Sequence, residues 1–343
     1  MTPFLLNYLC QPGTNLPLNL VDASYDKDGM IESGLLLATD GSAYPIVNGI
    51  PRFLKQVNVD TVASFGDQWN YFNFTDFKQN WLQHTVASTF GSTEEFRNKI
   101  IVDAGGGSGA QTLWFLESGA KHVIMMELSH SVDDVVKYNL TGYRNVDVIQ
   151  CSIDAPPLKD KSIDGIVYCH NVIMHTPSVE KTAHALFGIT APSGEFVFNC
   201  YGVNDGPGML RWLRFHIIGK GKGAMRKHMT DRQAMAYAYV MAWIRFIPVL
   251  GWVLEKSCLI RCGDVPLESG EYKLSLSYLK RRFKQAYLNM RDEFGQHSFQ
   301  HSKTESELRD LLHELQPDDT KILNVDKYFM RPPPIGCAFR IFR

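Results

Sequence analysis

Residues 100–110 read Ile-Ile-Val-Asp-Ala-Gly-Gly-Gly-Ser-Gly-Ala, and this stretch decides the fold of the chain. An apolar run ends in the carboxylate of Asp103, and glycine then stands at every second position, at Gly105, Gly107 and Gly109. Glycine adopts positive φ angles and lets a ligand approach the backbone where a Cβ would collide. Residues 111–116 read as the start of a helix, whose first amides carry the positive end of its dipole. The pattern predicts the first strand–loop–helix turn of a nucleotide-type site in a parallel α/β sheet.

Two kinds of cofactor could use this loop. Residues 105–110 fit the relaxed dinucleotide fingerprint Gly-x-Gly-x-x-Gly/Ala, with an acid, Glu127, at about the expected later position. The same stretch, from Asp103 to Gly109, also spells Asp-x-Gly-x-Gly-x-Gly. That pattern resembles motif I of the class I S-adenosylmethionine (SAM) methyltransferases. The loop alone does not separate the two.

A strand–helix alternation follows the loop, as in a parallel α/β sheet. The expected strands are 122–127, 146–151, 162–170 and 196–201, and the expected helices are 132–139 and 180–189. The second strand ends in Glu127, where an acid can accept both hydroxyls of a ribose. Segments 320–325 and 336–342 are expected to complete the sheet.

Three later motifs favour one cofactor. They are Ser-Ile-Asp at 162–164, His-Thr-Pro at 175–177 and a Pro-Ser-Gly-Glu turn at 192–195. In order and spacing they resemble consecutive landmarks of class I SAM methyltransferases, and a nicotinamide enzyme has no reason to carry them. The resemblance implies an α/β fold with a Rossmann-like seven-stranded methyltransferase sheet and SAM as the cofactor. The SAM-binding core would span 56–202 and end in 291–343.

The resemblance also carries the cofactor site onto residues of this chain. The glycine loop would hold the methionine and ribose portion of SAM, and Glu127 the ribose hydroxyls. For the adenine, the family usually has an acid just after strand three, where this chain has Ser152, with Asp154 two places later. Either the Ser152 hydroxyl and a backbone carbonyl bind the adenine, or Asp154 does. The expected cofactor-binding residues are Asp103, Gly105, Gly107, Gly109, Glu127, Ser152, Ile153 and His170.

Residues 1–55 read as a small β module. Tyr44 to Leu54 predicts a strand, an Asn-Gly turn and a second strand. The stretch resembles the end of zinc-ribbon modules related to activators of tRNA methyltransferases, in which two Cys-x-x-Cys pairs bind the metal. Here Ala38 and Gly41 occupy the later pair, and Cys10 keeps one thiol of the earlier pair. A structural zinc needs four ligands, so we expect a metal-free hairpin packed on the main domain.

Residues 65–72, Phe-Gly-Asp-Gln-Trp-Asn-Tyr-Phe, resemble a segment that helps to cover the cofactor in methyltransferases with such a module. Trp69 and Tyr71 are therefore candidate substrate-binding residues. An aromatic helix that fills a seam between domains is an equally open interpretation.

Residues 203–290 are longer than a strand-to-strand link requires, which predicts an insertion. Its apolar content predicts a mainly helical cap over the carboxyl edge of the sheet, forming most of a pocket for a partly apolar acceptor. The six charges from Arg211 to Lys227 are all basic, which indicates an amphipathic surface or, alternatively, a site for an anionic ligand or a membrane surface. Within it, Arg245, Pro248 and Gly251 interrupt the apolar run 234–254, so no membrane span is expected.

Methyl transfer to oxygen requires a base, and His175 is the best placed because it follows strand four at the carboxyl edge. Residues 292–307 are similar to a late family segment in which an aspartate and an aromatic–Gln/Glu–His run face the substrate. Histidines on a solvated loop are the alternative interpretation. The catalytic candidates are His175, Asp292 and His301, and the substrate-binding candidates are Trp69, Tyr71, Tyr201 and His297.

Composition limits the function further. The net charge of the 343 residues is −1, which gives no global attraction to nucleic acid. The seven cysteines form no disulfide or zinc framework, and the N-terminus carries no secretory signal, so a cytoplasmic protein is expected. We therefore expect a SAM-dependent methyltransferase that acts on an oxygen or nitrogen of a partly apolar small molecule. We expect it to bind no metal and to be able to form a homodimer. A non-catalytic SAM-binding module and a tRNA-directed methyltransferase are the alternatives.

Overall fold

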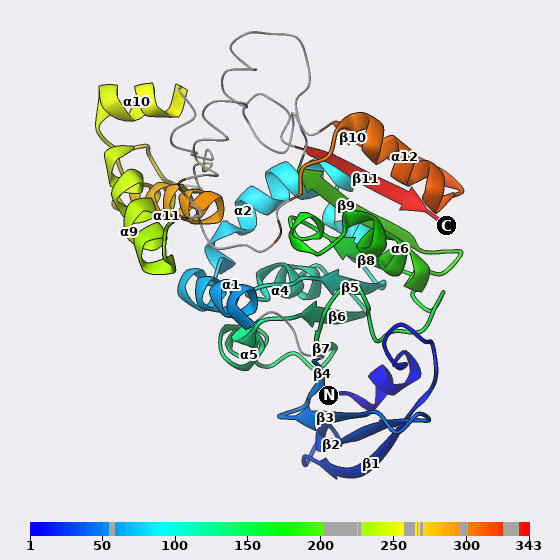
Figure 1. The fold of residues 1–343 in the computed structure, drawn as a ribbon. Coiled ribbons are helices and arrows are strands. Elements are labelled where there is room, and N and C mark those ends of the chain that lie inside the picture. Colours follow the sequence, from blue (N-terminus) through cyan, green and yellow to red (C-terminus); the bar gives the residue numbers. More distant parts are fainter. Residues whose placement is uncertain are drawn as a thin grey trace. The chain divides into compact units, whose positions relative to one another are not determined.

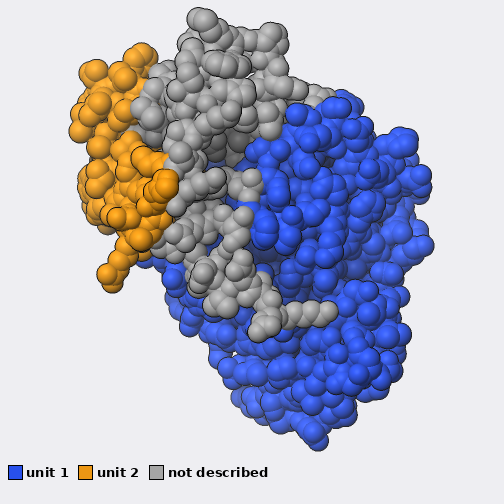
Figure 2. All heavy atoms as spheres, in the orientation of Figure 1, with its two compact units in different colours: residues 1–203, 299–325, 336–343 blue, residues 204–298, 326–335 orange. Residues whose placement is uncertain are grey.

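The computed structural model describes residues 1–54, 59–201, 225, 228–256, 265, 267, 270–294, 299, 301–324 and 336–343 (Figure 1). The chain divides into two compact units (Figure 2). Unit 1 comprises 1–203, 299–325 and 336–343, and unit 2 comprises 204–298 and 326–335. Each unit is described by itself.

Unit 1 is built on one sheet. The bounds of its strands are β1 (Leu18–Tyr25), β2 (Ile31–Ala38), β3 (Ala43–Val47), β4 (Ile50–Phe53), β5 (Ile100–Ala104), β6 (His122–Glu127), β7 (Val146–Cys151), β8 (Ile166–Cys169), β9 (Glu195–Tyr201), β10 (Asp319–Asn324) and β11 (Gly336–Phe342). They lie in the order β1-β2-β3-β4-β7-β6-β5-β8-β9-β11-β10. Strands β7, β6, β5, β8 and β9 are parallel, whereas β11 is antiparallel to both β9 and β10. The seven strands from β5 onward confirm the predicted Rossmann-like sheet.

Helices alternate with these strands. In unit 1 the α-helices are α1 (Val59–Phe72), α2 (Lys78–Asn80), α3 (Ala87–Thr89), α4 (Ala110–Glu117), α5 (Val135–Asn139), α6 (Val179–Ile189) and α12 (Glu305–Leu315). A π-helical turn, Trp81–Val86, joins α2 to α3. Trp81 and Phe115 lie in a buried aromatic cluster with Phe96, which fixes α4 beside β5. Helix α12 begins with the expected capping box, in which Thr304 and Glu307 bond each other's backbone amides.

The N-terminal module continues the sheet. The predicted hairpin is present as β3 and β4, joined at Asn48 and Gly49, both with positive φ. Strand β4 then pairs in parallel with β7, with Arg52 opposite Gln150. Residues 1–55 therefore belong to the same compact unit as the core, because the open edge of β7 accepts β4. Among the described residues, no group of three His, Cys, Asp or Glu side chains could hold a metal.

A buried carboxylate fastens the N-terminus to the core. The Asp147 side chain on β7 is fully buried and accepts a hydrogen bond from the Thr2 amide at 2.6 Å and one from the Thr2 hydroxyl. The Nε2 atom of His122, on β6, lies 2.9 Å from the same carboxylate. One side chain thus joins two core strands to the first turn of the chain.

Unit 2 is helical where it is described. Its helices are α9 (Asp231–Ile244), α10 (Pro248–Lys256) and α11 (Leu276–Phe294). Ala234, Ala238 and Ala242 form one buried face of α9, and the small side chains allow α11 to approach closely. No helix in the described part of the chain is long and apolar enough to cross a membrane. That residues 203–290 cap the acceptor site stays a prediction.

We predict that Asp147→Ala lowers the free energy of unfolding by about 2–4 kcal/mol, because it leaves the amide and hydroxyl of Thr2 buried without their acceptor. Urea unfolding measures the change. The control Asp310→Ala, at an exposed position of α12, should shift it by no more than about 0.5 kcal/mol. A loss below about 1 kcal/mol in Asp147→Ala would show that this anchor is dispensable.

Candidate cofactor and acceptor site

The glycine loop lies where the strand order reverses. Strand β5 has β6 on one side and β8 on the other, so the loops that follow β5 and β8 diverge at the carboxyl edge of the sheet. Gly105, Gly107 and Gly109 have φ angles of 84°, 60° and 77°. A Cβ on Gly105 would lie 2.5 Å from the Val172 side chain, so both the backbone conformation and the space require glycine.

The end of β6 fixes the shape of this loop. The amide of Gly105 donates to the Met126 carbonyl at 2.8 Å. The amide of Gly107 donates to Glu127 Oε2 at 2.9 Å, and the Ser131 hydroxyl donates to the Gly107 carbonyl at 2.8 Å. These three hydrogen bonds hold the loop in one conformation. The motif Ser129-x-Ser131 after the acid was the sequence signal for this support, and it was missed.

Glu127 is a buried acceptor with capacity left. Its Oε1 accepts the Ser129 amide at 2.8 Å, while Oε2 accepts the Gly107 amide. Burial raises the pKa of Glu127, and the two amides act in the opposite direction. A carboxylate offers about four lone-pair sites, so two remain beyond these amides. These remaining acceptor sites fit the two hydroxyls of a ribose, which donate.

Asp103, on β5, stabilises the start of the glycine loop. Its carboxylate is buried and accepts a hydrogen bond from the Thr112 hydroxyl of α4 at 2.6 Å. Burial, and then the neighbouring charge of Glu127, raise the pKa of Asp103 to about 7. The bond to Thr112 joins the end of β5 to the first turns of α4, across the loop.

The remaining cofactor candidates lie after β7 and β8. The Ser152 hydroxyl donates to Asp154 Oδ1 at 2.5 Å, and Lys181 Nζ lies 3.3 Å from Asp154 Oδ2. Asp154, one of the two adenine candidates, is thus paired with a lysine. Ile153 is buried, and the ring of His170 stacks on Tyr168 with centroids 5.7 Å apart. Burial lowers the pKa of His170 to about 4, so this imidazole is neutral at pH 7.

A row of rings leads from the glycine loop to the catalytic candidate. The Trp69 ring lies against Gly107, where a Cβ would be 3.0 Å from its Cε2. Phe65 stacks on Trp69 with centroids 6.3 Å apart and meets the His175 ring edge-on at 5.5 Å. The ring of Tyr201 lies perpendicular to His175 at 5.7 Å. Trp69, His175 and Tyr201 therefore share one side of the site, while Tyr71 is 68% exposed and outside the row.

A distant segment completes the surroundings of His175. The Nδ1 atom of His175 lies 3.3 Å from the Phe299 carbonyl oxygen. The amide of His301 donates to the Met174 carbonyl at 2.8 Å, so His301 runs beside the same turn. Asp292 lies on α11, in unit 2. The side chain of Asp292 and all of His297 fall outside the described residues.

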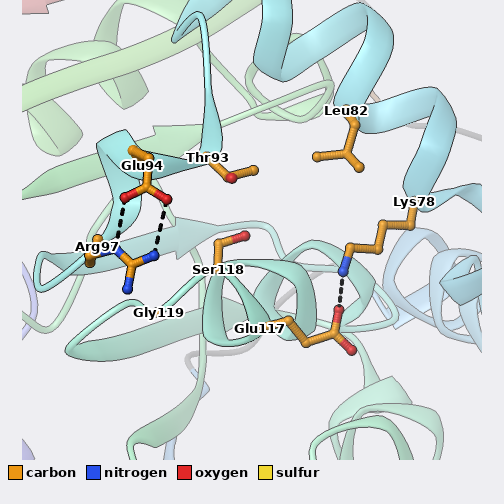
Figure 3. Close-up of a pocket in the computed structure, with 8 residues that line it drawn as sticks. All are labelled: Lys78, Leu82, Thr93, Glu94, Arg97, Glu117, Ser118 and Gly119. Carbon is orange, nitrogen blue, oxygen red and sulfur yellow. Dashed lines mark hydrogen bonds and ion pairs between the residues drawn. The ribbon is translucent and has the colours of Figure 1, made fainter.

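A separate surface pocket of about 300 Å³ lies away from this site (Figure 3). Its lining includes Glu117 at the end of α4 and Arg97 before β5, so it lies at the amino edge of the sheet. Two ion pairs, Lys78–Glu117 and Arg97–Glu94, occupy its walls. It contains none of the expected site residues.

We predict that Asp103→Asn stabilises the fold more at pH 8 than at pH 5. Because the folded pKa of Asp103 is raised from an unfolded value near 4, the folded state binds more protons between about pH 4 and 7, and stability from this group falls as pH rises through that window. Asparagine keeps an acceptor for Thr112 and carries no charge. Urea unfolding at both pH values measures the difference, with Asp310→Asn as the exposed control. An equal effect at both pH values would contradict it.

Comparison with known proteins identifies the domain. Residues 102–198 match the family model described as "Methyltransferase domain". A 76-residue stretch is 37% identical to protein arginine N-methyltransferase 1 of Oryza sativa subsp. indica, and the same holds for subsp. japonica. The stretch is 21% of this chain and 19% of each rice protein, so the chain spans about a fifth of the length of the curated relatives it matches.

Solved methyltransferase structures are similar at low sequence identity. One is the complex between the Haloferax volcanii Trm112 methyltransferase activator and a methyltransferase, with a TM-score of 0.43 at 10% identity, covering 81% of this chain and 96% of that one. Another is an S-adenosylmethionine dependent methyltransferase from Mesorhizobium loti, with a TM-score of 0.42 at 14% identity, covering 73% and 93%. The family match coincides with the strands that carry the glycine loop and Glu127. Residues 102–198 are therefore a methyltransferase domain, and its cofactor is S-adenosylmethionine.

Proposed function

We propose that this chain transfers the methyl group of SAM to an oxygen or nitrogen atom of a partly apolar small molecule. The observation that carries the proposal is the row of rings from Trp69, against the glycine loop, to His175. It joins a cofactor cradle to a candidate base through apolar surface. A non-catalytic binding module would have no need of a histidine held at that position.

Different residues of the chain have separate roles in this reaction. SAM supplies an electrophilic methyl group on a sulfonium. Glu127 accepts the ribose hydroxyls, and the backbone of the glycine loop borders the methionine portion. Trp69 and Phe65 cover the loop with aromatic surface, which excludes water and keeps the acceptor in line for displacement.

The tautomer of His175 suits a general base. The Phe299 carbonyl can only accept a hydrogen bond, so Nδ1 carries the hydrogen and Nε2 of the neutral ring carries the lone pair. As the new O–C or N–C bond forms and the C–S bond breaks, the acceptor's proton passes to Nε2. The sulfur retains the electron pair of the broken bond.

The surroundings of His175 indicate the acceptor class. Phe65 and Tyr201 present ring surface on two sides of the imidazole. Aromatic walls with one or two polar atoms recognise a small molecule that has an apolar body and a hydroxyl or amine. We assign the acceptor to that class.

We predict that Glu127→Ala weakens the binding of S-adenosylhomocysteine by about 1.5–3 kcal/mol, because it removes charged acceptors of the ribose hydroxyls and of the Gly107 amide. Isothermal titration calorimetry measures the affinity. Glu117→Ala, at the exposed far end of the α4 helix, is the matched control and should bind as the wild type does. Unchanged affinity in Glu127→Ala would show that the acid only supports the end of β6.

We predict that radiolabelled SAM transfers its methyl group to a component of a small-molecule cell extract, and not to total tRNA or to cell protein. His175→Phe keeps a ring against Phe65 and Tyr201 but removes the base, so transfer should fall at least about 100-fold with unchanged S-adenosylhomocysteine affinity. His184→Phe, at an exposed position on α6, is the control. Label in tRNA or protein alone would refute the acceptor class, and full activity of His175→Phe would refute the base.

A further inference from the structure

Unit 2 presents a dense group of exposed apolar side chains. Eight of them lie between residues 239 and 253, on α9, on α10 and on the link between the two helices. We call this group the α9–α10 apolar surface: Tyr239, Val240, Trp243, Ile247, Val249, Leu250, Trp252 and Val253. Their exposed fractions run from 44% for Leu250 to 76% for Val249. Proteins rarely leave so many large apolar side chains together in water unless the surface meets a partner or a membrane.

The packing of unit 2 fixes these side chains outward. The alanine face of α9 packs against α11. On an adjoining face of α9, the rings of Tyr239 and Trp243 contact the Phe283 ring and stay partly exposed. Helix α10 folds closely onto the end of α9, since a Cβ on Gly251 would lie 2.2 Å from the Arg245 carbonyl oxygen. Glycine therefore allows α10 to pack closely against the end of α9. This packing fixes the position of α10 and of its exposed side chains.

The charge of the same segment is strongly basic. Residues 203–290 contain 15 Lys and Arg and 6 Asp and Glu, a net charge of +9, while the whole chain carries −1. Nearby in unit 2, Lys280 is exposed, and the Arg282 guanidinium lies over the Phe246 and Tyr278 rings. Positive charge is thus concentrated in the segment that also carries the apolar surface.

We propose that the α9–α10 apolar surface docks on an anionic lipid bilayer. Short helices with Trp and aliphatic residues insert to the depth of the headgroups, where Trp is at its most stable. Each Lys or Arg near an anionic leaflet adds about 1 kcal/mol. Helix α10, Pro248–Lys256, is too short to span, which suits a peripheral contact. Nucleic acid fits less well, because the exposed side chains of α10 are mostly aliphatic and offer one ring for stacking.

The test is co-sedimentation of the full chain with vesicles of phosphatidylglycerol and phosphatidylcholine, and with vesicles of phosphatidylcholine alone. We expect binding to the anionic vesicles that weakens as salt is raised. The double variant Val249→Ser/Trp252→Ser should lower the partition coefficient at least tenfold. Tyr138→Ser, at a 76% exposed aromatic position on α5 in unit 1, is the matched control and should change it less than twofold. An unchanged helical signal in circular dichroism would confirm that the double variant is folded.

Three results would overturn the proposal. The first is no binding to anionic vesicles at low salt, and the second is equal binding by the double variant and the wild type. The third is a dimer without lipid that the double variant dissociates, which would make the surface an interface between two copies. Binding of total RNA without vesicle binding would instead assign the basic segment to nucleic acid. None of these measurements depends on the acceptor, so the outcome is separate from that of the proposed function.

Discussion

The hydrogen bond from the Gly107 amide to Glu127 is the interaction on which the candidate cofactor site depends. It joins two features that lie 20 residues apart in the sequence. One is the glycine loop with positive φ angles after β5, and the other is the carboxylate at the end of β6. The Ser131 hydroxyl bonds the Gly107 carbonyl and the Ser129 amide bonds Glu127, so both serines stabilise the same arrangement. Preorganisation of this kind saves the entropy that a flexible loop would lose on binding.

Burying two carboxylates in the candidate site costs free energy, and other contacts in unit 1 offset part of it. Asp103 and Glu127 are both buried, and burial opposes the charge of each. Hydrogen bonds from the Thr112 hydroxyl to Asp103, and from the Gly107 and Ser129 amides to Glu127, offset part of this cost. The N-terminal module supports the same region. Arg52 on β4 pairs with Asp133 at 2.6 Å and donates to Gln150 at 2.7 Å. Gln150 in turn donates to the Leu128 and Ser129 carbonyls, at 3.2 Å each, so the N-terminal module supports the segment that follows Glu127.

Sequence predicted the parts that local patterns determine. The glycine loop, Glu127, the strand–helix alternation and the Asn-Gly hairpin each depend on residues close together in the chain, and all are present. Pairings between distant segments were not predictable in the same way. The parallel joining of β4 to β7 and the approach of Phe299 to His175, 124 residues away, arise only from the tertiary fold. Tyr71 and Trp69 are both aromatic, so their residue types gave no reason to expect only one of them beside the glycine loop. They lie two positions apart on one helix, which places Tyr71 on a different, exposed face.

The central claim is that the exits of β5 and β6 form the SAM site. The most direct measurement is a crystal structure of the protein with S-adenosylhomocysteine. We predict density beside the glycine loop, with both ribose hydroxyls about 3 Å or less from the Glu127 carboxylate and the sulfur on the side of the site that carries His175. Binding at any other place, such as the pocket between Lys78 and Arg97, or a ribose that makes no contact with Glu127, would contradict the account.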